Sequence, residues 1–110
     1  MAAVWSCALT CAAAGTKGFR NVCGIPYHTD GKGGERCRLD LRIPEGFTNF
    51  PTVVWYHGGG LVHGGRGGYC QICRNPANGI GGVSVGYRFL TEATPEETVG
   101  DAAAALAWTL

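Results

Sequence analysis

The chain has 110 residues, of which 45% are hydrophobic and 15% are charged. This length suits one domain with a modest core, and the composition excludes an intrinsically disordered chain. Nine basic and eight acidic residues give a formal net charge of +1 and form no basic block, so the sequence predicts no nucleic-acid partner. No apolar stretch approaches the roughly 18 residues of a membrane span, so we expect no transmembrane segment.

Residues 1–23 carry few signals of regular structure, and we expect a separate N-terminal segment there, either a leader or a disordered stretch. Residues 1–15 are small and apolar, and Ala12-Ala13-Ala14 is similar to a cleavage region, but the basic start of a secretory signal is missing. Localisation therefore stays open between the cytoplasm and export. Residues 24–36 include Pro26, Asp30 and several glycines, which indicate turns.

Two strands are predicted next along the chain. From Cys37 to Pro44, apolar residues alternate with charged ones, which is typical of a half-buried strand with one polar face. The run Thr52–Tyr56 is almost entirely β-branched or aromatic, so we expect a central strand that is covered on both faces. This second strand leads directly into a run of three glycines after His57.

The second half of the chain predicts a short helix over residues 69–78, a third strand over Gly82–Tyr87, and a long final helix. The helix has Thr94 as its cap, Pro95 at its first position and Glu97 three residues after the cap. Strands that alternate with helices indicate an α/β fold with a mostly parallel sheet and flanking helices.

The glycine run after Thr52–Tyr56 suits acyl-transfer chemistry. In such a reaction negative charge builds on a carbonyl oxygen, and backbone N–H groups aimed at that oxygen stabilise the transition state. Loss of one such donor costs about 3–4 kcal/mol. Glycine suits this position because side chains would block the approach, and the rigid strand in front fixes the loop.

Three segments together resemble the α/β-hydrolase family of esterases and lipases. Tyr56–Leu61 resembles the family's HGGG loop, Val83–Arg88 resembles the next strand with its Tyr-Arg end, and Asp101–Trp108 resembles the helix before the nucleophile strand. The resemblance covers residues 24–110 and implies the N-terminal part of an α/β-hydrolase domain, truncated before the nucleophile elbow. Its partners would be a small ester substrate and the remainder of the hydrolase domain.

The resemblance also implies roles for individual residues. The amides of Gly59 and Gly60 would be the oxyanion donors, and His57 and Gly58 would support the loop. Two structural polar residues near the site would be Arg88 and Glu92. No metal or organic cofactor is implied. We therefore expect the oxyanion-hole portion of a serine carboxylesterase or lipase, which would be inactive by itself.

The sequence departs from the family pattern at Gly86, where the family often has Asn, and at Thr91, where it often has Pro. Ser84 lies in a literal G-x-S-x-G string, but a nucleophile elbow is a strained strand-to-helix turn. The valines that flank Ser84 favour an extended strand, and no histidine follows it. We expect Ser84 to be a strand residue and the catalytic serine, acid and histidine to lie outside this chain.

The six cysteines leave further alternatives open. Cys70 and Cys73 have the spacing of a metal-ligand or redox pair, and the same spacing suits buried or incidental thiols, or a disulfide. Two rival functions therefore stand beside the hydrolase: a non-catalytic, hydrolase-like interaction module, and a small Cys-rich protein that holds disulfides or a metal.

Overall fold

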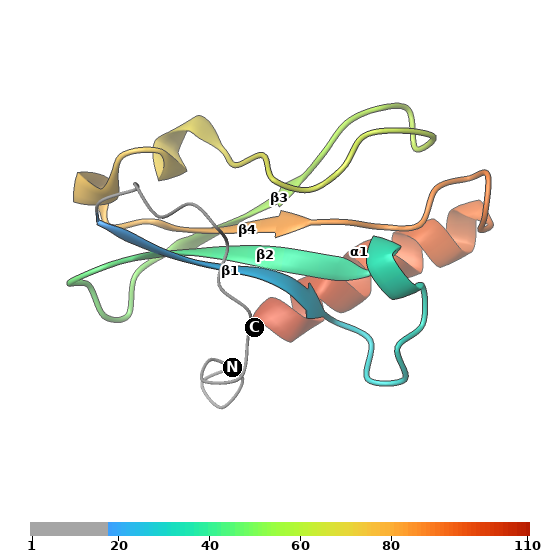
Figure 1. Ribbon diagram of the computed structural model, residues 1–110, viewed down its shortest axis with the longest axis horizontal. Helices are drawn as coiled ribbons and strands as arrows, with labels where there is room; N and C mark the ends of the chain where they lie inside the picture. The colour runs from blue at the N-terminus through green and yellow to red at the C-terminus, as the bar shows by residue number, and fades with distance from the viewer. Residues whose placement is uncertain (1–17) are drawn as a thin grey trace.

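A four-stranded sheet with a helix on one face forms the described part of the chain, residues 18–110 of the computed structural model (Figure 1). The leader expected in residues 1–15 lies outside the described residues. The elements in chain order are β1 (Phe19–Pro26), η2 (Gly34–Arg36), β2 (Arg38–Pro44), β3 (Thr52–Tyr56), η3 (Gln71–Cys73), η4 (Pro76–Asn78), β4 (Gly81–Val85) and α1 (Pro95–Thr109).

The sheet is mixed, with the strand order β1-β2-β4-β3. The pairs β1–β2 and β2–β4 are antiparallel, and only β3–β4 is parallel. The prediction of a mostly parallel sheet with flanking helices is therefore wrong for residues 18–110, which contain α1 as their one α-helix. Residues 27–37 turn the chain straight back, whereas residues 57–80 are long enough for a parallel crossover.

Strand β1 was not predicted, because its apolar residues do not alternate. Its buried apolar residues Phe19, Val22 and Ile25 are spaced by three residues. The pairing with β2 shifts register between Val22 and Ile25, so a bulge-type irregularity places these two side chains together in the core. The sheet thus begins at Phe19, inside the range assigned to the N-terminal segment.

Strand β3 is present as predicted, but it lies at the edge of the sheet. Within residues 18–110 its sole neighbour is β4, and Trp55 and Tyr56 are 39% and 37% exposed. The prediction of a central strand covered on both faces is therefore wrong for this part of the chain. An apolar run indicates a preference for burial, but it does not supply the neighbours that would bury it.

The two faces of the sheet are covered differently. On one face α1 packs through Ala104, Ala105 and Trp108 against a core of strand residues that includes Leu39 and Val85. On the other face lies the β3–β4 connection, with η3 and η4 (Figure 1). The predicted polar face of β2 is confirmed, but it is turned toward this connection instead of toward solvent.

Helix α1 begins as the sequence predicts. Thr94 Oγ1 accepts a hydrogen bond from the Glu97 N–H (3.2 Å), and Glu97 Oε1 accepts one from the Thr94 N–H (2.9 Å). The helix predicted over residues 69–78 is replaced by η3 and η4, because Asn75 caps a separate turn that starts at Pro76. Residues 18–110 contain no helix that is long and apolar enough to cross a membrane.

Candidate functional site

The glycine loop leaves the carboxyl end of β3 and folds into a tight turn. Gly59, Gly60 and Leu61 have φ values of 124°, 64° and 65°, all in the region that favours glycine. The Gly59 carbonyl oxygen accepts hydrogen bonds from the N–H groups of Val62 (3.2 Å) and His63 (3.3 Å). The loop is therefore a closed turn with a defined backbone, rather than an extended connection.

The positions of this loop differ in how strictly they require glycine. A Cβ at Gly59 would lie 1.9 Å from the His63 carbonyl oxygen, and one at Gly64 would lie 2.5 Å from the preceding loop backbone. Gly60 has open space but a positive φ, and Gly58 has open space without one. The turn thus strictly needs Gly59 and Gly64, favours glycine at position 60, and leaves Gly58 free to vary.

The N–H groups of Gly59 and Gly60 donate no hydrogen bond to any atom of the described chain. The parallel pairing of β3 with β4 ends at Tyr56, so these two amides lie beyond the strand ladder. Within the described residues, both amides are therefore left without an acceptor just after the carboxyl end of β3.

His57 is held firmly against the residues that follow β4. Its ring stacks on Tyr87, with centroids 4.4 Å apart and planes tilted by 7°, and Phe89 meets it edge-on at 6.0 Å. The Tyr87 hydroxyl donates to the His57 carbonyl oxygen. His57 Nδ1 lies 2.8 Å from the Gly58 carbonyl oxygen, a distance that suits a hydrogen bond in the tautomer with Nδ1 protonated. These contacts fix where the glycine loop begins.

The rest of the loop is anchored across the far face of the sheet. Arg66 Nε donates to Asp40 Oδ1 on β2 (2.9 Å), and Arg66 Nη1 donates to the Glu35 carbonyl oxygen (3.0 Å). This anchor was not predicted from the sequence. Its signal was the carboxylate of Asp40 on the polar face of a strand, which needs a cation once it is covered.

Ser84 is a strand residue, as predicted. It lies within β4, is 0% exposed, and its Oγ accepts a hydrogen bond from the Gly67 N–H (2.8 Å). A nucleophilic serine must meet its substrate at a surface, so this buried hydroxyl serves to hold the loop.

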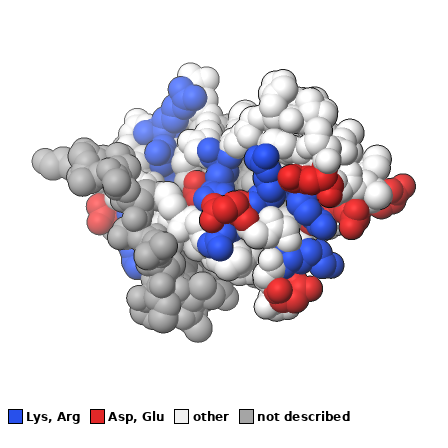
Figure 2. Space-filling model, turned by 45° about the vertical axis from the view of Figure 1, so that its right-hand side comes forward, with Lys and Arg blue, Asp and Glu red and all other residues white. Residues whose placement is uncertain are grey.

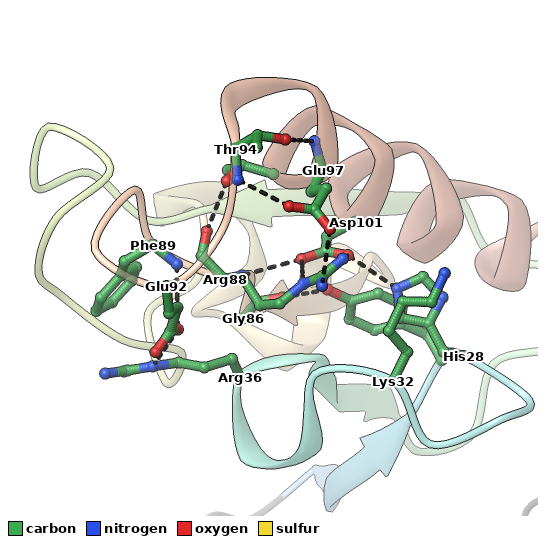
Figure 3. Close-up of polar contacts among 12 residues, drawn as sticks. His28, Lys32, Arg36, Gly86, Arg88, Phe89, Glu92, Thr94, Glu97 and Asp101 are labelled. Carbon is green, nitrogen blue, oxygen red and sulfur yellow. Dashed lines mark hydrogen bonds and ion pairs between the residues drawn. The ribbon is translucent and has the colours of Figure 1, made fainter.

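Arg88, which follows β4, and Asp101 on α1 form a largely buried ion pair (Figure 3). Arg88 Nε and Nη2 donate to Asp101 Oδ2 (2.8 Å) and Oδ1 (2.9 Å), and the Arg88 N–H donates to Oδ2 (3.1 Å). His28 Nε2 lies 2.9 Å from Oδ1. Burial alone would raise the pKa of Asp101, but hydrogen bonds from Arg88 and His28 outweigh it and hold that pKa well below its usual range.

Glu92 closes the turn between β4 and α1. Its Oε1 accepts hydrogen bonds from Arg36 Nε (3.0 Å) and from the Phe89 N–H (3.2 Å), and the Arg36 guanidinium lies over the Phe89 ring at 4.0 Å. The contacts of Arg88 and Glu92 given above thus join segments of the described chain to one another.

Basic and acidic side chains are interspersed over the face seen in Figure 2.

A hollow of about 230 Å³ lies beside the loop. Its walls come from the end of β3, from the loop itself and from the exposed side of α1, and they include Tyr56, His57, Leu61, Val99 and Ala102. The lining is mostly apolar.

Within residues 18–110, three potential metal ligands lie together at His28, Cys37 and Asp101, with ligand atoms within 4.8 Å of one another. Both carboxylate oxygens of Asp101 already accept hydrogen bonds from Arg88. A cation would have to displace a guanidinium, so this cluster suits a hydrogen-bond network better than a metal.

Crystal structures of esterase B from Lactobacillus rhamnosis resemble this chain. Two of them, one of which carries a tributyrin phosphonate, match with a TM-score of 0.70 and 26% sequence identity. A third, an inhibited form, matches with a TM-score of 0.65 and 24% identity. Each match covers 84% of this chain and 30% of the esterase chain, so this chain matches part of an esterase fold. No family model matches the sequence, and no curated protein matches it significantly.

Proposed function

We propose that this chain supplies the oxyanion-hole portion of a serine carboxylesterase-like hydrolase that acts on small carboxylic esters. The observation that carries the proposal is the pair of N–H groups of Gly59 and Gly60. They lie at the carboxyl end of β3 and donate no hydrogen bond to the described chain. The likeness to esterase B, at 26% identity over 84% of this chain, supports the same reaction class.

The chemistry follows from the position of these donors. When a nucleophile attacks an ester carbonyl, the carbonyl oxygen takes on negative charge, and fixed N–H groups stabilise that charge without having to reorient. The stack of His57 on Tyr87 and the anchor between Arg66 and Asp40 hold the loop from both ends. A loop held in this way keeps its amides in position throughout the reaction.

The nucleophile, base and acid would come from further hydrolase segments, and the topology favours one place for them. The β3–β4 connection crosses one face of the sheet, while α1 leaves β4 over the other face. Right-handed crossovers on opposite faces run in opposite directions, so a strand after α1 would pair with the free edge of β3. This chain spans about 30% of the length of the esterase chains that it matches.

The proposal is tested with the full-length product of the gene, assayed on a short-chain nitrophenyl ester. Gly59→Ala forces a Cβ into the His63 carbonyl oxygen, so we expect kcat to fall by about 10²–10³-fold, as when one oxyanion donor is lost. Gly58→Ala is the matched control, because its Cβ meets nothing within 4 Å, and it should keep most of the activity.

Denaturant unfolding of both variants separates a displaced loop from global unfolding. Equal losses in Gly58→Ala and Gly59→Ala would contradict the assigned donors. A folded full-length protein without any ester turnover would favour the interaction module. The 110-residue chain alone should be inactive, and turnover that disappears in Ser84→Ala would contradict the role given to Ser84.

A further inference from the structure

The turn η3 brings two cysteines together. The Cys73 N–H donates to the Cys70 carbonyl oxygen (2.9 Å), which closes a four-residue turn over Cys70–Cys73. A turn of this kind keeps the first and fourth Cα atoms within about 7 Å, and a disulfide needs Cα atoms about 4.4–6.8 Å apart. The backbone is therefore already close to the geometry of an intramolecular disulfide.

The two thiols differ in access. Both are free, Cys70 is partly exposed, and Cys73 is 0% exposed. Cys73 Sγ lies 3.5 Å from the Gly81 carbonyl oxygen at the start of β4, and burial raises the pKa of the Cys73 thiol. The pair thus has one thiol that a reagent in solution can reach and one that is shielded behind it.

We propose that Cys70 and Cys73 form a redox-active dithiol that exchanges with small disulfides such as oxidised glutathione. The Cys70 thiolate attacks one glutathione sulfur, so that a mixed disulfide forms and one glutathione thiolate leaves. The Cys73 thiol then loses its proton and attacks Cys70 Sγ, which forms the Cys70–Cys73 bond and releases the second glutathione. The protein loses two electrons and two protons, and one glutathione disulfide becomes two glutathione thiols.

A metal is a weaker occupant of this turn. Structural zinc sites use four protein ligands. Within residues 18–110, the group of three potential ligands lies at His28, Cys37 and Asp101 and includes neither cysteine of the turn. Two thiolates without further ligands suit a disulfide better than a metal ion.

The position of the turn gives the exchange a structural consequence. The pair lies in the β3–β4 connection, between the Gly67 amide bound to Ser84 and the start of β4. Oxidation would link the partly exposed Cys70 to the buried Cys73 through a disulfide bond. This inference does not depend on ester hydrolysis, because it concerns a different part of the connection.

The test uses the full chain in glutathione buffers with increasing fractions of the oxidised form, followed by thiol alkylation and peptide mass mapping. We expect a Cys70–Cys73 disulfide, two hydrogens lighter than the dithiol, whose fraction rises and saturates with the oxidised fraction. Cys73→Ala should stop at the mixed disulfide on Cys70. Cys70→Ser should leave Cys73 largely as a thiol, because burial shields it.

Cys37→Ser is the matched control, because Cys37 is also a buried free thiol but lies on the other face of the sheet. It should leave the titration of the pair unchanged. The wild-type chain decides the question even if a variant fails to fold. A mixed disulfide on Cys70 without ring closure, or pairing of Cys70 with another cysteine, would overturn the proposal. So would thiolate-to-cobalt absorption bands on addition of Co²⁺ that depend on both cysteines.

Discussion

Asp101 connects three segments of the chain that lie far apart in the sequence. Its carboxylate accepts hydrogen bonds from Arg88, which follows β4, and lies 2.9 Å from His28, which follows β1. The side chain itself comes from α1 and is about 1% exposed. A buried carboxylate is stable only when donors surround it, and here the donors come from two separate strand ends. Asp101 therefore holds α1 against the segments that follow the carboxyl ends of β1 and β4.

We expect Asp101→Asn to lower the free energy of unfolding by about 3 kcal/mol, because it removes the buried carboxylate that pairs with two nitrogens of the partly buried Arg88 guanidinium. The folded-state pKa of Asp101 is lowered, so its contribution is complete at neutral pH. The contribution is lost as the pH falls below about 4, where the unfolded chain begins to bind the proton. Urea unfolding at pH values between pH 3 and pH 7, spaced by about one pH unit, measures both the loss of stability in the variant and its dependence on pH.

The control for this prediction is Glu96→Gln on the same helix, because Glu96 is exposed. It should change stability by no more than about 0.5 kcal/mol. If wild type and Asp101→Asn lose stability in parallel on acidification, then Asp101 is not the group that titrates.

At this scale the sequence predicted the position of the glycine loop, while the roles given to its amides stay a prediction. The glycine loop could be predicted, because strand and glycines are adjacent along the chain. The pairs that hold it could not, because Arg66 reaches Asp40 across 26 residues and His28 reaches Asp101 across 73. Local patterns carry no information about which distant charges will meet.

Among the elements, helix α1 was the most predictable, because its start is determined by residues within one turn. The reciprocal hydrogen bonds between Thr94 and Glu97 satisfy two N–H groups that the helix itself cannot. Strand β2 was also predictable from a local pattern, because its apolar and charged residues alternate between the two faces of the sheet. Strand β1 was not, because its bulge breaks the alternation, and residues 69–78 were not, because Asn75 and Pro76 start a new turn.

Two substitutions in α1 should act in opposite directions. Thr94→Ala removes the cap and should lower the free energy of unfolding by about 1 kcal/mol. Gly100→Ala should raise it by about 0.4–1 kcal/mol, because Gly100 is exposed and helical and an added Cβ meets nothing within 4 Å. Thermal melts followed by circular dichroism compare the two, and a shift in the same direction for both would contradict this account of the helix.

At the scale of the whole molecule, the free edge of β3 is the feature most prone to cause association between molecules. It presents an apolar strand with exposed Trp55 and Tyr56, and Val99 and Leu106 of α1 are also exposed, at 66% and 45%. Natural proteins usually protect such edges with charges, prolines or covering segments. Within residues 18–110 no other strand pairs with this edge.

We therefore expect the isolated chain to self-associate as its concentration rises. Trp55→Lys should reduce this association, because it places a charge on the exposed edge strand. Leu110→Lys makes the same change in net charge at a side chain that is 93% exposed but outside the strands, and it should have little effect. Sedimentation velocity compares the two, and a wild-type chain that stays monomeric throughout would contradict the expectation.

The place of β4 between β2 and β3 has a consequence for the order of folding. Strands β1 and β2 are neighbours both in sequence and in space, so they can form a hairpin as soon as both have been synthesised. Strand β3 has no such partner and must wait for β4. Tyr87, whose hydroxyl donates to the His57 carbonyl oxygen, lies just after the end of β4 at Val85. The glycine loop after β3 should thus be among the last segments to become ordered during synthesis on the ribosome.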